Sequence, residues 1–167
     1  KAYIGLFAVT SGINVELYEK IFEKDEDDYN GIMIKAITDR LAEAFAEYMH
    51  DRVRKDLWGY QPKELSTEDM IQEKYQGIRP APGYPACPEH TVKKDIFTIL
   101  QTDEIGMQLT DSMAMHPASS VSGFYFAHPD AKYFSVDKID EDQLEDMASR
   151  RSVPTKQLRK WLGPNLR

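Results

Sequence analysis

The sequence has a single cysteine, Cys87, and no long run of apolar residues. One cysteine cannot form a disulfide within the chain, so we expect a reducing, cytoplasmic setting. A helix that crosses a bilayer needs about 20 consecutive apolar residues, and no stretch approaches that length. The sequence therefore predicts neither a disulfide-stabilised secreted domain nor a protein embedded in a membrane.

The sequence also lacks an excess of positive charge, since its formal net charge is −7 at pH 7. Proteins that bind the phosphate backbone need clustered positive charge, so we expect no general nucleic-acid binding. One local exception is the segment 150–167, which contains six basic residues and no acidic one. This segment either docks an acidic partner or forms a solvated helix face, and the second interpretation is the simpler one.

The chain begins with Lys1 rather than methionine, and its first residues are too few and too strand-like for a secretory signal. We therefore expect a piece of a longer protein. A chain of this length forms one domain that buries roughly 70% of its unfolded surface. No internal repeat or low-complexity linker divides the sequence, so we expect one domain over residues 1–167.

The first half of the sequence predicts a strand followed by helices. Tyr3–Thr10 is rich in residues that favour strands, and a short helix is expected over Val15–Phe22. Asp27 or Asp28 can cap a long helix over Tyr29–Leu57, in which apolar residues recur at three- and four-residue spacing. The stripe consists of Ile34, Ile37, Leu41, Phe45 and Tyr48. Charged residues and alanines lie toward the other side of this helix, so another element can approach that side closely.

The second half mixes helices and strands. Ser66 predicts the start of a short helix that runs to about Tyr75, and Thr91 predicts the start of another that runs to about Gln101. Further strands are expected over Met107–Leu109, Val121–Ala127 and Tyr133–Val136, and further helices over Asp140–Arg150 and Pro154–Leu162. Because strands and helices do not alternate regularly, the predicted fold class is α+β, with a mainly antiparallel β-sheet and flanking α-helices.

A proline-rich segment interrupts this pattern, since residues 79–90 hold four of the nine prolines. Proline fixes its own backbone angle and lacks an N–H donor, so the segment can be neither a regular helix nor a central strand. A long irregular segment between helices is usually functional. Arg79 at its start could bind a carboxylate through two parallel hydrogen bonds, and Gly83 permits close approach of a ligand.

The run Arg-Pro-Ala-Pro-Gly-Tyr-Pro-Ala-Cys-Pro-Glu-His over residues 79–90 closely resembles the signature of the activation domain of cobalamin-dependent methionine synthase. The similarity to that family covers nearly the whole chain. The other runs that carry it are Lys35–Ala36, Asp39–Glu47, Trp58–Tyr60, Tyr75–Ile78, Ser120–Gly123, Tyr125–Phe126, His128–Pro129 and Lys132–Phe134.

This resemblance implies a function. A domain of this family binds S-adenosylmethionine and supports the reductive remethylation of cob(II)alamin, which returns the parent methyltransferase to its active state. The cobalamin is bound mainly by another domain of the same polypeptide, and the electron comes from flavodoxin or a flavin reductase. We therefore expect S-adenosylmethionine and cobalamin as cofactors, and no catalytic residue of the chain itself, because the cofactors carry the chemistry.

The resemblance also implies roles for charged residues. Arg79 would hold the carboxylate of S-adenosylmethionine, while Glu43 and Glu73 would suit its positive or hydrogen-bond-donating groups. Each has a simpler interpretation from the sequence alone. Glu43 and Glu73 lie on helix faces that are usually only solvated, and Arg79 could merely cap a preceding carbonyl group.

The remaining implied site residues are backbone and aromatic groups. The backbones of Ala81 and Gly83 would read the adenine, Tyr84 would lie toward the corrin, and Tyr133 with Phe134 would complete the pocket. Either tyrosine could instead be a plain packing residue. The family's domain is longer, and its N-terminal half, which carries an aspartate that helps to hold the ligand, has no counterpart in this sequence.

Other functions stay open at this stage. A sensing or docking module that binds S-adenosylmethionine without chemistry would suit the same proline-rich segment. A free-standing methyltransferase of the nucleotide-binding fold is disfavoured, because no glycine-rich strand-to-helix loop occurs. Cys87 and His90 have a spacing that zinc sites use, but a structural zinc site needs four ligands and no second cluster of cysteine and histidine occurs, so we expect no metal.

Overall fold

The computed structural model describes residues 3–167, and its main sheet joins strands that are far apart in the sequence. Strand β1 (Gly5–Thr10) pairs antiparallel with β4 (Ser120–Tyr125) along its whole length. A smaller antiparallel pair joins β2 (Gln108–Leu109) to β3 (Met115–His116). The α+β class and the antiparallel pairing predicted from the sequence are confirmed.

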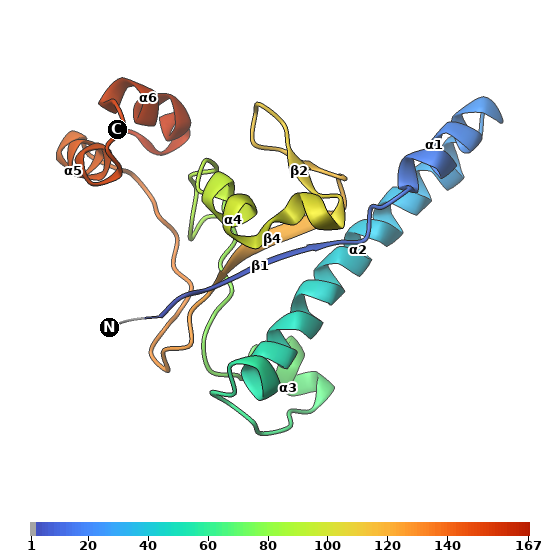
Figure 1. Ribbon diagram of the computed structural model, residues 1–167, viewed down its shortest axis with the longest axis horizontal. Coiled ribbons are helices and arrows are strands. Elements are labelled where there is room, and N and C mark those ends of the chain that lie inside the picture. Colours follow the sequence, from blue (N-terminus) through green and yellow to red (C-terminus); the bar gives the residue numbers. More distant parts are fainter. Residues whose placement is uncertain (1–2) are drawn as a thin grey trace.

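Helices lie on both sides of the β1–β4 sheet (Figure 1). Side chains alternate across a strand, so neighbours in β1 point to opposite faces. Phe7 packs on the side of the long helix α2 (Asp28–Arg52), whereas Leu6 packs on the side of α4 (Lys93–Leu100). The sheet therefore has an apolar core on each face, and the α2 side is the one that carries the site described below.

Helix α1 (Val15–Lys24) packs alongside the first half of α2, and a short acidic turn joins the two helices (Figure 1). The turn ends at Asp27, whose carboxylate accepts hydrogen bonds from the backbone N–H of Asn30 at 3.1 Å and from its side-chain amide at 2.6 Å. Asp27 is thus the predicted cap of the long helix. The last predicted turn of that helix is a π-helical segment, η1 (Val53–Leu57).

The side of α2 that faces the sheet is its small and polar side, not its apolar stripe. The buried residues of the helix are Thr38, Ala42, Ala46 and His50. Four members of the apolar stripe are 42% to 54% exposed, namely Ile37, Leu41, Phe45 and Tyr48. Small side chains let the helix approach the sheet closely, as the sequence predicts. The stripe of large apolar residues stays largely uncovered within residues 3–167.

The short helix α3 (Thr67–Ile71) begins as predicted and ends earlier. The side chain of Ser66 accepts a hydrogen bond from the backbone N–H of Asp69 at 3.1 Å, which caps its first turn. The predicted continuation to Tyr75 is wrong, because Glu73 adopts a left-handed backbone conformation with a φ of 51°. A helix cannot pass through such a residue, so the chain turns there toward the proline-rich segment.

Helix α4 starts one residue later than predicted, with Val92 rather than Thr91 as its N-terminal flanking residue. The hydroxyl of Thr91 is engaged elsewhere, since it accepts a hydrogen bond from the guanidinium of Arg151 at 3.1 Å. The helix ends as predicted at Gln101, which is left-handed, and the short helix η2 (Thr102–Ile105) follows.

The strand predicted over Tyr133–Val136 is wrong. The segment is extended, but within residues 3–167 it belongs to no strand. The backbone N–H of Val136 donates to the carbonyl of Pro85 at 2.8 Å. Proline has no N–H to return, so a ladder cannot continue from this contact. The segment instead connects the sheet to the C-terminal helices and forms one wall of a cavity.

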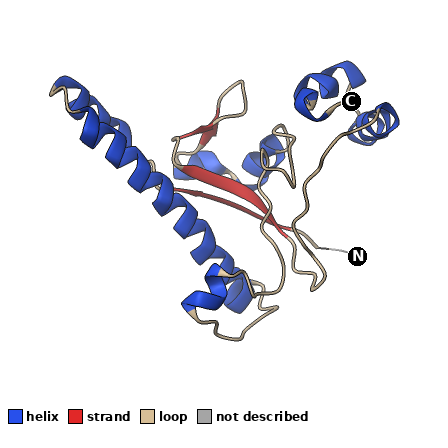
Figure 2. Cartoon of the chain, turned by 180° about the vertical axis from the view of Figure 1, so that it is seen from behind, coloured by secondary structure: helices blue, strands red, loops and turns tan. Residues whose placement is uncertain are grey.

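The last helices, α5 (Glu141–Arg151), α6 (Thr155–Trp161) and the short η3 (Gly163–Asn165), form a separate cluster away from α2 (Figures 1 and 2). Both predicted helices are thereby confirmed to within one residue at each end. Their shared core consists of Leu144, Ala148, Leu158 and Leu162. An ion pair between Arg151 and the buried carboxylate of Glu89 ties this cluster to the proline-rich segment. No helix within the described residues is long and apolar enough to cross a membrane.

Candidate functional site

The proline strip, as we call residues 79–90, folds back on itself in a tight turn. The backbone N–H of Gly83 donates to the carbonyl of Cys87, and the N–H of Cys87 donates to the carbonyl of Tyr84, both at 2.8 Å. Gly83 has a φ of +100°, and a Cβ atom at this position would lie 2.3 Å from Cε1 of His90. Only glycine fits here, because any side chain would strain the backbone and collide with the imidazole.

The strip is joined to the edge of β4 by backbone hydrogen bonds. Ile78 and Phe126 exchange two N–H···O bonds of 3.0 Å each, and the N–H of Phe124 donates to the carbonyl of Pro80 at 3.0 Å. A Cβ atom on Gly123 would lie 2.5 Å from the same carbonyl, so this glycine allows the close approach. The start of the strip is therefore held rigidly against the sheet.

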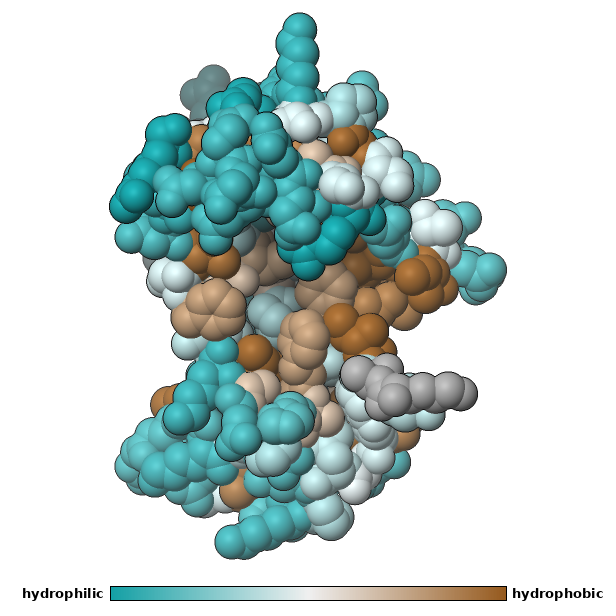
Figure 3. Space-filling model, turned by 90° about the vertical axis from the view of Figure 1, so that its left-hand side faces the viewer, coloured by the Kyte–Doolittle hydropathy of each residue, from teal (hydrophilic) through white to brown (hydrophobic). Residues whose placement is uncertain are grey.

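Between the strip, α2 and the segment 133–135 lies a cavity of about 520 Å³. This volume is within the range of small-molecule sites. Seen from the side of the C-terminal helices, the surface is hollowed across its middle and apolar side chains gather there (Figure 3). The cavity is lined by Phe7, Glu43, Ala46, Arg79, Pro80, Ala81, Tyr84, Pro85, Ala86, Val121, Tyr133, Phe134 and Ser135.

Most of the residues proposed from the sequence lie together on this cavity. Those that line it are Glu43, Arg79, Ala81, Tyr84, Tyr133 and Phe134. Gly83 lies in the turn between Ala81 and Tyr84 without lining the cavity, and Glu73 is exposed at the end of α3. Burial raises the pKa of Tyr133, and the negative charge of Glu73 contributes to the same shift. Glu73 is thus near the aromatic wall although it is not part of it.

The guanidinium of Arg79 is held from two sides. Its Nη2 atom lies 2.6 Å from Oε2 of Glu47, and its Nη1 donates to the hydroxyl of Tyr75 at 2.6 Å. The backbone N–H of Arg79 donates to the hydroxyl of Tyr133 at 2.9 Å. The side chain is 20% exposed, so it keeps one edge toward the cavity while most of it is packed. Burial raises the pKa of Tyr75, and its phenol therefore stays protonated.

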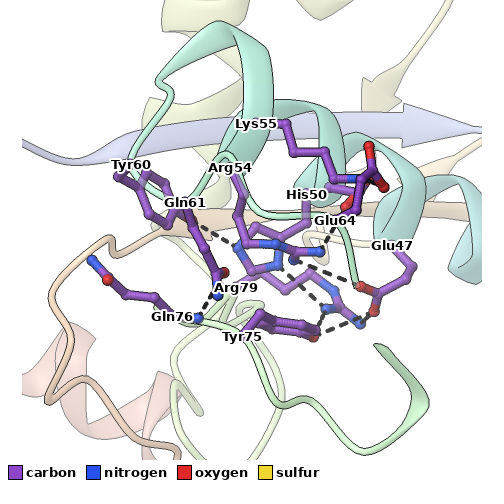
Figure 4. Close-up of polar contacts among 11 residues, drawn as sticks. Glu47, His50, Arg54, Lys55, Tyr60, Gln61, Glu64, Tyr75, Gln76 and Arg79 are labelled. Atoms are coloured by element: carbon purple, nitrogen blue, oxygen red, sulfur yellow. Dashed lines mark hydrogen bonds and ion pairs between the residues drawn. The ribbon is translucent and has the colours of Figure 1, made fainter. Parts of the chain in front are cut away.

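Behind Arg79 lies His50, on the buried side of α2 (Figure 4). Its Nε2 lies 3.0 Å from the hydroxyl of Tyr60, and its Nδ1 lies 3.5 Å from Nη1 of Arg79. The imidazole also stacks on the ring of Tyr125 at a centroid distance of 5.1 Å. Burial, followed by the positive charges of Arg54 and Arg79, lowers the pKa of His50 to about 3. A neutral imidazole can accept from Arg79 through Nδ1 while it donates to Tyr60 through Nε2.

Arg54 completes this cluster from the end of the long helix (Figure 4). Arg54 is 1% exposed, and its Nη2 lies 3.1 Å from Oδ1 of Asp51. Its guanidinium stacks 3.9 Å above the centre of the Tyr75 ring. A buried guanidinium needs such partners, because an unpaired charge is costly in a low-dielectric interior. The cluster thus packs against Arg79, which lines the cavity, and connects it to α2 and η1.

Sequence reasoning did not assign Glu47, His50 or Tyr75 to the site. A usable signal existed for two of them, because Glu47 lies one helical turn after Glu43 and His50 lies three residues further on, on the same side. Tyr75 carries no local signal, since its hydroxyl reaches Arg79 only after the turn at the end of α3. Glu43 itself is exposed and forms an ion pair with Arg40 at 2.7 Å.

The cavity combines three kinds of surface. Its floor is apolar, formed by residues such as Phe7, Ala46 and Val121. Exposed aromatic rings of Tyr84 and Phe134 stand at its opening, 59% and 69% accessible. A fixed guanidinium and a carboxylate complete its rim. This arrangement suits a ligand with a flat or apolar body and both an anionic and a cationic group.

Residues 1–152 of the chain match the sequence family described as "Vitamin B12 dependent methionine synthase, activation domain". The chain is also similar to a solved crystal structure, that of the MetH reactivation domain bound to AdoHcy, with 56% sequence identity and a TM-score of 0.94. That similarity covers 98% of this chain and 51% of the solved chain, so this chain spans about half the length of its structural relative.

Proposed function

Because the chain belongs to the family of activation domains of vitamin B12-dependent methionine synthases, we propose that its cavity binds S-adenosylmethionine in support of the reductive remethylation of cob(II)alamin. The observation that supports this most is the rigid Arg79 on the wall of a 520 Å³ cavity, in a fold whose relative was solved with AdoHcy. AdoHcy is S-adenosylmethionine without its transferable methyl group. A site for one is therefore shaped for the other.

The ligand's groups match the groups on the cavity. In this proposal Arg79 binds the carboxylate, because a guanidinium offers two parallel donors to a carboxylate. Glu43 and Glu73 attract the ammonium and the sulfonium, and both side chains are free enough in space to turn toward a bound cation. The polypeptide between Ala81 and Gly83 is stiff, so its backbone groups can be directed at the adenine.

The aromatic residues complete the proposed contacts. Tyr133 lies with its hydroxyl on the backbone of Arg79, so the aromatic wall and the carboxylate-binding residue are held in one arrangement. Phe134 adds a second ring to this wall, and the exposed Tyr84 faces outward, where a corrin ring would approach. The methyl transfer itself is chemistry that the bound cofactors supply, while the protein orients them.

The proposal includes the setting of the chain. We propose that it is the C-terminal part of an activation domain in a cytoplasmic methionine synthase, that the cobalamin is bound by another domain of the same polypeptide, and that flavodoxin or a flavin reductase supplies the electron. Two observations support a larger domain: the solved relative is about twice as long, since 51% of it is covered, and α2 carries an exposed apolar stripe. Exposed apolar surface of this kind typically marks an interface.

This setting is tested by adding the remaining half of a reactivation domain, produced as a separate polypeptide, to the 167-residue chain. We expect a stable one-to-one complex in size-exclusion chromatography with light scattering. Hydrogen exchange of α1 and α2 should slow in the complex. A chain that stays monomeric and unprotected in the mixture would show that the stripe has another role.

The function is tested with Arg79→Ala in the complete methionine synthase that contains this chain. We expect reactivation by S-adenosylmethionine to slow about 30-fold or more, because loss of a charged hydrogen-bond partner costs about 2–5 kcal/mol. The control is Arg52→Ala, which removes an exposed arginine that is ion-paired with Asp56 and does not line the cavity. Normal reactivation of the Arg79 variant would refute the proposed site.

A labelled methyl group separates this proposal from a sensing module. The complete enzyme is supplied with an electron donor and S-adenosylmethionine whose methyl group carries ¹⁴C. Reactivation predicts that the label appears on the cobalamin in step with recovery of activity. Tight binding of the ligand without transfer of label would support the sensing function instead.

A further inference from the structure

The donors of Arg79 are only partly used within the chain. A guanidinium has five N–H donors. One on Nη2 is directed to Glu47 at 2.6 Å, and the two on Nη1 are directed to Tyr75 at 2.6 Å and His50 at 3.5 Å. The Nε donor and a second Nη2 donor have no partner among residues 3–167, and two donors are enough to bind one carboxylate. The residues behind Arg79 therefore orient its guanidinium without exhausting it.

We propose that Glu47 is the positioning residue of the S-adenosylmethionine site, holding the guanidinium of Arg79 in the orientation that binds the ligand's carboxylate. This inference rests on the function proposed above. Glu47 itself does not contact the ligand; it acts through Arg79. It lies on α2 one turn after the cavity residue Glu43 and next to Ala46, which lines the cavity floor, so the helix that shapes the cavity also sets the position of the arginine.

Electrostatics explains why a carboxylate is needed at this place. Arg54 and Arg79 both contact Tyr75, since Arg54 stacks 3.9 Å above the centre of its ring and Nη1 of Arg79 donates to its hydroxyl at 2.6 Å. Their positive charges also both lower the pKa of His50. Like charges at such a distance repel. The carboxylate of Glu47 lies between them, with Oε2 at 2.6 Å from Arg79 and Oε1 at 3.8 Å from Arg54. Without it, the more exposed Arg79 would move outward, because Arg54 is 1% exposed and confined.

The contacts of Arg54 show that Glu47 forms its short ion pair with Arg79 rather than with Arg54. Oε1 of Glu47 and Nη1 of Arg54 are both buried without a hydrogen-bond partner among the described residues. Arg54 has its own short contact with Asp51 at 3.1 Å. The hydrogen-bonding oxygen of Glu47 is therefore the one on Arg79, and the attraction to Arg54 is only electrostatic.

The alternative is that Glu47 competes with the ligand for Arg79. In that case the ion pair would have to open before a carboxylate could bind. The two remaining donors of Arg79 argue against this, since the ligand can bind while the ion pair stays intact. The two mechanisms predict opposite effects of removing the charge, so a single substitution separates them.

The test compares two ligands that differ only in the carboxylate, S-adenosylmethionine and its decarboxylated form, by calorimetric titration into the complete activation domain that contains this chain. In Glu47→Gln, which keeps the side-chain volume and removes the charge, we expect S-adenosylmethionine to bind about 2- to 10-fold more weakly, the range for the loss of one pre-ordered long side chain. Binding of the decarboxylated ligand should stay within twofold. The matched control is Asp56→Asn, which removes an equal charge from the exposed ion pair with Arg52.

A second comparison tests whether Glu47 acts through Arg79. In an Arg79→Ala background, Glu47→Gln should cause no further loss of S-adenosylmethionine affinity. Glu47 acts through Arg79, so its substitution has no effect on binding once Arg79 has been removed. An equal loss of both ligands in Glu47→Gln, or tighter binding of S-adenosylmethionine, overturns the inference. If Arg79→Ala separates the two ligands and Glu47→Gln does not, the inference fails while the proposed function stands. If the unsubstituted domain binds neither ligand, the proposed function fails as well.

Discussion

The two sides of helix α2 differ in a way that reverses the usual relation between apolarity and burial. One side carries large apolar residues such as Leu41 and Phe45, and these are exposed. The other carries Ala46 and His50, and these are buried against the sheet. The buried side is held by close backbone approach and by a polar cluster around Arg79. The buried side of α2 therefore supports the cavity, while the apolar side is available for an interface.

The largest effect is expected from Ala46→Leu, which enlarges a residue on the buried side. Ala46 is 3% exposed in the core that contains Phe7 and Tyr125, and it also lines the cavity. Overpacking of this kind costs about 1–3 kcal/mol of unfolding free energy. The same change at Ala44, which is exposed two residues away, should stay within about 0.5 kcal/mol. Equal effects in urea unfolding would remove the difference between the two sides.

The next largest effect is a pH dependence of the unfolding free energy, caused by His50 on the buried side of α2. His50 has a folded-state pKa of about 3, whereas an unfolded histidine titrates near 6.5. Below pH 6.5 the unfolded chain binds a proton that the folded chain does not, so stability falls as the pH falls. Between pH 6.5 and 5, before most carboxylates titrate, the loss should approach about 2 kcal/mol.

The control for this dependence is His50→Gln, which keeps a polar group near Tyr60 and removes the titration. Its unfolding free energy should change less over the same pH interval, while His90 and the other histidines contribute equally to both proteins. Parallel curves for the two proteins in chemical denaturation would mean that His50 is protonated in the folded state.

The smallest effect in the 167-residue chain is expected on the exposed side. Leu41→Ala should change the unfolding free energy by no more than about 0.5 kcal/mol, because the side chain is 53% exposed. In the complete activation domain the same change should cost about 2 kcal/mol or more, the usual loss for a leucine in a packed core. Unfolding measured in both proteins sharpens the comparison, and equal small losses would show that nothing covers the stripe.

Much of the fold could be predicted from local sequence, because caps and periodic patterns act over a few residues. Asp27 and Ser66 are at the predicted helix starts, and the helices of the C-terminal cluster match their patterns. Periodicity also shows which side of α2 is apolar, but not that its other side packs on the sheet. That depends on pairing between β1 and β4, whose residues are more than 100 positions apart.

For the candidate site, the proline strip could be predicted from the sequence, whereas the ion pair of Glu47 with Arg79 could not. The run from Arg79 to His90 carries a distinctive composition, and six of the eight residues that the family resemblance indicates line one cavity, the exceptions being Glu73 and Gly83. The partner of Arg79 was only partly predictable, because helical spacing puts Glu47 on the same side of α2 as Glu43 but no local pattern links it to Arg79. The error at Tyr133–Val136 has a similar origin: a run of strand-favouring residues meets Pro85, which cannot continue a ladder.

The ion pair between Arg151 and Glu89 connects the C-terminal helices to the proline strip, whose first half lines the cavity. The segment between β4 and α5 contains Tyr133, whose hydroxyl accepts a hydrogen bond from the backbone N–H of Arg79. A displacement of α5 would therefore be transmitted along this segment to Tyr133 on the cavity wall.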